Sequence, residues 1–120
     1  MVLFLGYPKC STSQKAKKWL EAQGISFTQR DISRENPTEE ELRTWQARSG
    51  LPLKKFFNTS GQVYRALGLS QKLPGMSEEE QYKLLASDGM LVKRPLLVLE
   101  HRVLVGFVQE QWEDALQSSK

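Results

Sequence analysis

The chain has 120 residues, which is enough to bury a hydrophobic core without help from disulfides or a structural metal. It contains one cysteine and one histidine, which excludes an internal disulfide and a zinc site of the usual Cys/His kind. The net charge of +3 is small, and charges of both signs alternate along the chain. This pattern is typical of solvated helix faces and argues against direct nucleic-acid binding.

The N-terminal residues are apolar for only a short stretch and lack the charged start and long apolar region of a secretory signal peptide. No apolar run approaches the length of a membrane span. We therefore expect a cytoplasmic protein without a membrane partner.

The first quarter of the chain predicts a strand, a helix and a second strand. The apolar run from Val2 to Leu5 is closed by Gly6, which is typical of a short buried strand. Residues Ser11 to Gly24 repeat apolar side chains at helical spacing, with glycine at the expected helix end. The β-branched and aromatic side chains of Ile25 to Ile32 predict the second strand.

Two pairs of residues in the middle of the chain have the spacing of a helix capping box. They are Thr38 with Glu41, and Ser77 with Glu80. In such a box the Ser or Thr side chain and the Glu side chain each accept a backbone N–H at the helix start. The pairs predict two helices, the second of which extends to about Ser87.

Short helical pieces are expected between these two helices, around Lys54 to Phe57 and Gln62 to Leu67, because Pro52 and Gly61 interrupt any longer helix. Together with the two capped helices, these pieces form a helical insert over about residues 37–90.

The C-terminal part predicts a β-hairpin and a last helix. The apolar runs Leu96 to Leu99 and Val103 to Val105 flank a short polar turn, in which His101 is a solvated residue rather than a general base. Val108 and Trp112 are expected on the apolar face of the helix that follows. Trp19, Trp45 and Trp112 are all expected in the core.

This order of elements predicts an α/β fold in which a mixed four-stranded sheet carries a helical insert between strands 2 and 3. We find no linker or internal repeat, and therefore expect residues 1–120 to form one domain.

Cys10 falls in the loop between the first predicted strand and the first helix, at the carboxyl edge of the sheet. The free N–H groups and the dipole of a helix start stabilise an anion, so we expect a lowered thiol pKa. The hydroxyls of Ser11, Thr12 and Ser13 and the Lys9 ammonium are further donors to a thiolate or substrate. A buried cysteine that only packs is the alternative, but the polar flanks favour a reactive thiol.

Arg94 and Pro95 stand at the start of an apolar strand, where proline is tolerated and a cis peptide bond can occur. From its residue type alone, Arg94 would be assigned to a surface ion pair. Its position ahead of a buried hairpin favours a second interpretation, in which Arg94 holds an oxyanion or the Cys10 thiolate.

The chain resembles the ArsC/Spx/YffB group of thioredoxin-like proteins, which includes the glutaredoxin-type arsenate reductases. The resemblance covers nearly the whole chain and is carried by the segments YPKCSTSQKAKKWL, KKFFNTSGQVYRALGL, LLASDGMLVKRPLLVL and VLVGF. It implies a thioredoxin-like fold with Pro95 as a cis-proline beside the active site. It also implies that Cys10 is the nucleophile and that Arg94 contacts the oxyanion or the thiolate.

The chain differs from the arsenate reductases of this group at two positions where the resemblance implies arginine. Asn58 and Gly106 stand there instead. Each missing arginine removes charge-assisted hydrogen bonds to arsenate, worth about 1.5–3 kcal/mol each. We therefore expect Asn58 to be part of the site, but arsenate to be a poor substrate.

Ser13 stands where many redox proteins carry a second cysteine, so Cys10 cannot clear a mixed disulfide within the chain. Turnover then needs an external thiol, either glutathione or a glutaredoxin- or thioredoxin-like partner, and no bound cofactor. The expected activity is the thiol-dependent reduction of a small oxyanion or a disulfide.

Two alternatives to an enzyme stay open. Resemblance to Spx implies a transcriptional regulator that binds the α subunit of RNA polymerase, although Ser13 removes the Cys-x-x-Cys switch that most such proteins use. The other alternative is a thioredoxin-like module without enzymatic activity.

Overall fold

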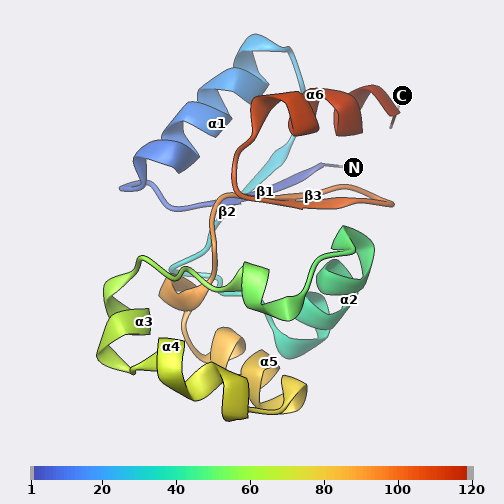
Figure 1. The fold of residues 1–120 in the computed structure, drawn as a ribbon. Coiled ribbons are helices and arrows are strands. Elements are labelled where there is room, and N and C mark those ends of the chain that lie inside the picture. The colour runs from blue at the N-terminus through green and yellow to red at the C-terminus, as the bar shows by residue number, and fades with distance from the viewer. Residues whose placement is uncertain (1, 119–120) are drawn as a thin grey trace.

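A computed structural model describes residues 2–118 of the chain, in which a four-stranded sheet lies between two layers of helices (Figure 1). The spatial order of the strands is β2-β1-β3-β4, with β2 parallel to β1, β3 antiparallel to β1, and β4 antiparallel to β3. Their bounds are Leu3–Gly6 (β1), Thr28–Asp31 (β2), Leu96–Val98 (β3) and Val103–Val105 (β4). The predicted mixed sheet is therefore confirmed.

Helices α1 (Ser11–Ala22) and α6 (Gln109–Ser118) cover one face of the sheet, and the segment between β2 and β3 covers the other (Figure 1). That segment contains α2 (Glu39–Ser49), η1 (Leu53–Phe56), α3 (Gln62–Ala66), α4 (Leu69–Lys72), η2 (Leu73–Gly75), α5 (Glu78–Ser87) and η3 (Gly89–Leu91). We call it the insert. This arrangement of sheet and helices is the predicted thioredoxin-like fold.

The sheet has a hydrophobic core on each face, because successive side chains of a strand point in opposite directions. Phe4 and Leu97 pack on the side of α1 and α6, around the fully buried Trp112. Leu5 and Leu96, the neighbours of these two strand residues, pack toward the insert. The insert thus shares a continuous core with the sheet.

Both predicted capping boxes form, and they start α2 and α5. Thr38 Oγ1 accepts the Glu41 N–H at 3.1 Å, and Ser77 Oγ accepts the Glu80 N–H at the same distance. Glu41 also pairs with Arg30 of β2 at 2.7 Å, and this hydrogen-bonded partner holds the pKa of the Glu41 carboxyl below its usual value. The ion pair joins the edge strand to the start of the insert.

The structure corrects the sequence-based expectation for the second strand and for the burial of two side chains. The second strand covers only Thr28–Asp31 rather than Ile25 to Ile32, because it is an edge strand that pairs only with the four residues of β1. Val108 precedes α6 and is 47% exposed, so its predicted place on the buried face is wrong. Trp19 is half-buried, whereas Trp45 and Trp112 lie in the core as predicted.

Within the insert, the segment after η1 meets the segment after η3 at an isolated antiparallel bridge between Phe57 and Val92. Two backbone hydrogen bonds of 2.7 Å flank this bridge: the Asn58 N–H donates to the Leu91 carbonyl, and the Lys93 N–H donates to the Phe56 carbonyl. The bridge brings Asn58 next to the segment that carries Lys93 and Arg94.

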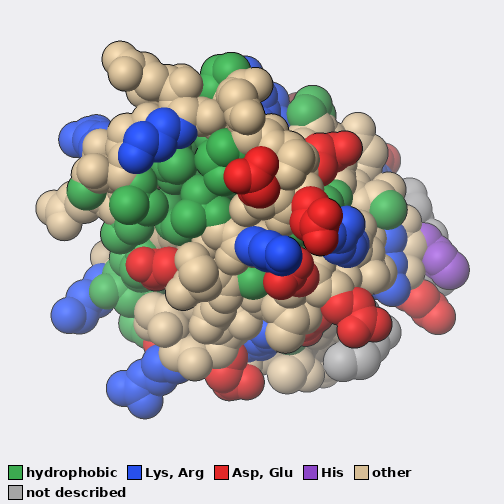
Figure 2. All heavy atoms as spheres, turned by 90° about the horizontal axis from the view of Figure 1, so that it is seen from below, with side chains coloured by type: hydrophobic (Ala, Val, Ile, Leu, Met, Phe, Trp, Pro, Cys, Tyr) green, Lys and Arg blue, Asp and Glu red, His purple; other side chains and the backbone are tan. Residues whose placement is uncertain are grey.

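The surface of the insert carries charges of both signs. Figure 2 shows Lys and Arg side chains beside Asp and Glu side chains across this face, and hydrophobic side chains gathered in one area on the left of the view. Of the helices within residues 2–118, none is both long and apolar enough to cross a membrane.

Candidate active site

Cys10 is the residue that caps the N-terminus of α1. Its backbone is extended, with φ −92° and ψ 119°, and its carbonyl accepts the Gln14 N–H at 3.0 Å. Its own N–H donates to the Tyr7 carbonyl at 2.9 Å, which closes the loop after β1. The half-buried thiol is therefore held beside the free N–H groups of the first helical turn.

The surroundings of the thiol favour its ionised form. Burial opposes ionisation, but the Ser13 hydroxyl and the N–H groups of Ser13 and Thr12 donate to Cys10 Sγ, and Arg94 adds positive charge. As a result, the pKa of the Cys10 thiol lies below its ordinary value, in the direction that the sequence predicted. Thr12 acts through its backbone N–H rather than through its hydroxyl.

Ser13 fills the position of a second cysteine with a buried hydroxyl, only 3% exposed. Its oxygen accepts the Tyr7 N–H at 3.2 Å while the hydroxyl donates to Cys10 Sγ. Ser13 is thus a positioning residue that links the loop backbone to the thiolate.

A Ser13→Ala variant should raise the pKa of the Cys10 thiol, because the strongest hydrogen bond to the thiolate is lost. The rate of alkylation by iodoacetamide, measured against pH, should reach half of its plateau at a higher pH than in the wild type, and the rate at pH 7 should fall. Ser11→Ala is the matched control, because Ser11 is exposed and makes no hydrogen bond to Cys10. Identical pH profiles for the wild type and Ser13→Ala would contradict this role.

Arg94 is half-buried and is held by backbone and aromatic groups. Nη1 donates to the carbonyls of Met90 and Val92, both at 3.3 Å, and the guanidinium carbon lies 5.3 Å from the centroid of the Tyr7 ring. Its Nε is buried and has no hydrogen-bond partner within residues 2–118. In place of a surface ion pair, the structure therefore has a cation near Cys10 with a spare donor.

The peptide bond between Arg94 and Pro95 is cis, as the resemblance implies. Pro95 is buried, and its carbonyl accepts the Gly106 N–H at 2.8 Å. This contact links the segment that carries Arg94 to the end of β4.

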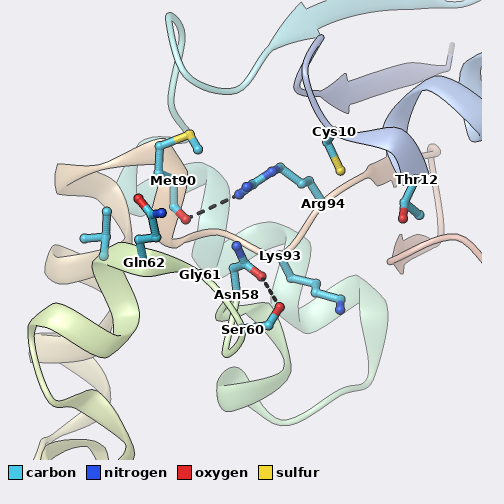
Figure 3. Close-up of a pocket in the computed structure, with 10 residues that line it drawn as sticks. Cys10, Thr12, Asn58, Ser60, Gly61, Gln62, Met90, Lys93 and Arg94 are labelled. Atoms are coloured by element: carbon cyan, nitrogen blue, oxygen red, sulfur yellow. Dashed lines mark hydrogen bonds between the residues drawn. The ribbon is translucent and has the colours of Figure 1, made fainter.

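The loop that carries Cys10 and the segment that carries Arg94 both line a cavity of about 560 Å³ (Figure 3). Its lining consists of Cys10, Thr12, Asn58, Ser60, Gly61, Gln62, Val63, Met90, Lys93 and Arg94.

Four of the residues proposed from the sequence line this cavity, namely Cys10, Thr12, Asn58 and Arg94. Ser13 and Pro95 are buried next to Cys10 and Arg94, whereas Lys9 and Ser11 are exposed and outside the lining. The other lining side chains had not been predicted as site residues: Ser60, Gln62, Val63, Met90 and Lys93. Only the adjacency of Lys93 to Arg94 could have indicated one of them.

The cavity lining has two basic side chains and no acidic one. Within residues 2–118, no three His, Cys, Asp or Glu side chains gather as metal ligands would. The chemistry available from these side chains is therefore that of a thiolate nucleophile beside a cation.

Comparison with known proteins assigns the chain to a family. The model of the ArsC family matches residues 5–115. The chain belongs to the ArsC family. An ArsC family related protein from Bacteroides fragilis has a similar crystal structure, with a TM-score of 0.92, 63% identity, and coverage of 94% of this chain and 95% of that one. The resemblance predicted from the sequence is confirmed.

Two curated relatives come from Bacillus subtilis (strain 168). The uncharacterized protein YusI is 54% identical over 92% of this chain and 94% of its own length. The regulatory protein MgsR is 32% identical over 87% of this chain and 81% of its own length. The relatives of this ArsC-family chain therefore include a regulator.

The structure locates Asn58 and Gly106, the two positions at which the resemblance implies arginine. Asn58 lines the cavity, where its Oδ1 accepts the Ser60 hydroxyl at 3.3 Å. Gly106 has a φ of +77°, and a Cβ at this position would lie 3.6 Å from Lys93 Cε. Neither residue supplies a charge to the cavity.

Proposed function

We propose that this ArsC-family protein is a monothiol reductase that acts on disulfides, with Cys10 as the nucleophile. The observation that carries the proposal is the position of Cys10 Sγ. The sulfur receives hydrogen bonds from Ser13 and Thr12 at the start of α1, and the positive charge of Arg94 also favours its ionised form. Cys10 and Arg94 line the same cavity.

The proposed reaction has two exchange steps. The Cys10 thiolate attacks one sulfur of RS–SR′, the Cys10–SR bond forms, and R′S⁻ leaves. An external thiolate R″S⁻ then attacks the sulfur of the R group, R″S–SR forms, and Cys10 leaves as a thiolate. Arg94 and the hydrogen-bond donors of α1 stabilise the anionic sulfur of Cys10 in both steps.

The second thiol comes from outside the chain, because Ser13 cannot attack the mixed disulfide. Glutathione, or a glutaredoxin- or thioredoxin-like protein, fits this role, and no bound cofactor is needed. Such thiols are kept reduced in the cytosol, so we assign the protein to the cytoplasm.

Arsenate fits the cavity less well than a disulfide does. Arg94 is the one arginine in the lining, Asn58 is neutral, and Gly106 contributes no side chain. Without arginine at these two positions, arsenate loses charge-assisted hydrogen bonds worth about 1.5–3 kcal/mol each.

A coupled assay tests this assignment. The purified protein is given a mixed disulfide or arsenate, with glutathione plus glutaredoxin and with thioredoxin as separate donors. We expect turnover of the disulfide with at least one donor, and arsenate turnover at the background rate. Faster turnover of arsenate, or no turnover of disulfide with any donor, would contradict the proposal.

The relation to a regulatory protein supports a second candidate function, that of a regulator. The resemblance to Spx implies RNA polymerase as its partner. The direct test is a pull-down with the C-terminal domain of the polymerase α subunit, with Cys10 reduced and with Cys10 oxidised. Absence of binding in both states removes this candidate.

A further inference from the structure

The cavity has an excess of positive charge, which comes from Lys93 and Arg94. No Asp or Glu side chain belongs to its lining, and within residues 2–118 no carboxylate lies within ion-pair distance of Lys93. Two neighbouring cations without a counter-ion raise the local potential and attract an anionic ligand.

The backbone of Lys93 is held in place, and its side chain is exposed. The Lys93 N–H donates to the Phe56 carbonyl at 2.7 Å, beside the bridge between Phe57 and Val92. The stem passes over Gly106, where Cε would lie 3.6 Å from an added Cβ. At that distance an added Cβ would be in ordinary van der Waals contact with the Lys93 stem.

Lys93 and Arg94 act on different parts of the cavity. Their side chains extend in opposite directions from neighbouring backbone positions (Figure 3). The charge of Arg94 is among the causes that lower the pKa of the Cys10 thiol. The Lys93 ammonium is therefore available to a part of the ligand that lies away from the reacting sulfur.

We propose that Lys93 determines specificity by binding a carboxylate of the disulfide substrate, away from the sulfur that Cys10 attacks. This inference rests on the proposed function and adds the substrate class, namely disulfides that carry a carboxylate. Asn58, Ser60 and Gln62 line the same cavity and supply neutral hydrogen-bonding groups for the uncharged part of such a ligand.

Single-turnover kinetics with two chromogenic disulfides test the inference. Dithiobis(nitrobenzoate) carries a carboxylate on each ring, whereas dithiodipyridine carries none. In both reactions the Cys10 thiolate attacks, a mixed disulfide forms, and a coloured thiolate or thione is released. We expect Lys93→Gln to slow the reaction of the anionic reagent roughly three- to tenfold and that of the neutral reagent less than about twofold.

Two variants and a salt series control for net charge. Lys18→Gln makes the same change of charge on an exposed residue of α1 that is outside the cavity lining, and it should alter neither rate. Lys93→Arg should keep the preference for the anionic reagent. High salt should reduce that preference in the wild type, because the charges are screened.

Two results would overturn the inference: equal slowing of both reagents by Lys93→Gln, or the same effect from Lys18→Gln. Failure of the proposed function looks different, since Cys10 would then react with both reagents no faster than a free cysteine. The ratio of the two rates still reports on Lys93 in that case.

Discussion

A Cys10→Ser variant should lose disulfide reduction completely and keep the wild-type fold. A serine hydroxyl neither ionises near neutral pH nor forms the S–S bond of the mixed disulfide, so both exchange steps are blocked. The side chain is half-buried at a helix N-cap, where serine is a favoured residue, so the fold should tolerate the change. The coupled disulfide assay measures the activity, and thermal unfolding checks the fold.

Ser13→Cys is the informative companion to this variant. It creates a Cys-x-x-Cys pair, so the new thiolate can attack the mixed disulfide on Cys10, form an internal disulfide and release the substrate thiol. Mass spectrometry after treatment with oxidised glutathione should show a stable glutathione adduct on the wild type and an internal disulfide on Ser13→Cys. Disulfide turnover by Cys10→Ser above background would refute the nucleophile assignment.

The second large effect is expected from Gly89→Ala, at the start of η3. Gly89 is buried, and a Cβ there would lie 1.8 Å from the Ile32 carbonyl oxygen and 2.8 Å from its carbon. Because both contacts are with backbone, a segment of the chain must move. We expect a loss of about 3 kcal/mol or more in the free energy of unfolding, measured by urea denaturation.

Gly89→Ala should also disturb the active site. Gly89 precedes Met90, whose carbonyl accepts a hydrogen bond from Arg94, so a displaced η3 moves the guanidinium. Gly75→Ala is the matched control, since nothing lies within 4 Å of its added Cβ and its φ is not positive. If both variants unfold at the same urea concentration, the close approach of Gly89 to Ile32 is not a constraint on the fold.

The elements that the sequence predicted well depend on signals within a few residues of each other. Thr38 with Glu41 and Ser77 with Glu80 are complete capping boxes, and α2 and α5 start where these pairs predict. The short elements α4, η2 and η3 were not predicted. Helices of three or four residues are unstable alone and form only through contacts such as the burial of Leu69. No local sequence pattern predicts such contacts.

In the candidate site, too, some residues could be predicted from the sequence and others could not. The place of Cys10 after a strand and before a helix is a local pattern, and its pairing with Arg94 came from the resemblance. The inclusion of Ser60, Gln62 and Lys93 in the lining depends on the bridge between Phe57 and Val92. Such a contact between distant segments has no signature in the sequence.

The bridge between Phe57 and Val92 also separates the part of the insert near the thiol from a distal part. It closes a loop whose ends carry the residues that face Cys10 and whose distal part lies around the exposed Pro74 and Gly75. The entropy of a closed loop depends only weakly on its length, and doubling that length costs only about 0.6 kcal/mol. Relatives can therefore gain or lose residues around Pro74 and Gly75 during evolution while the geometry of the thiol site stays the same.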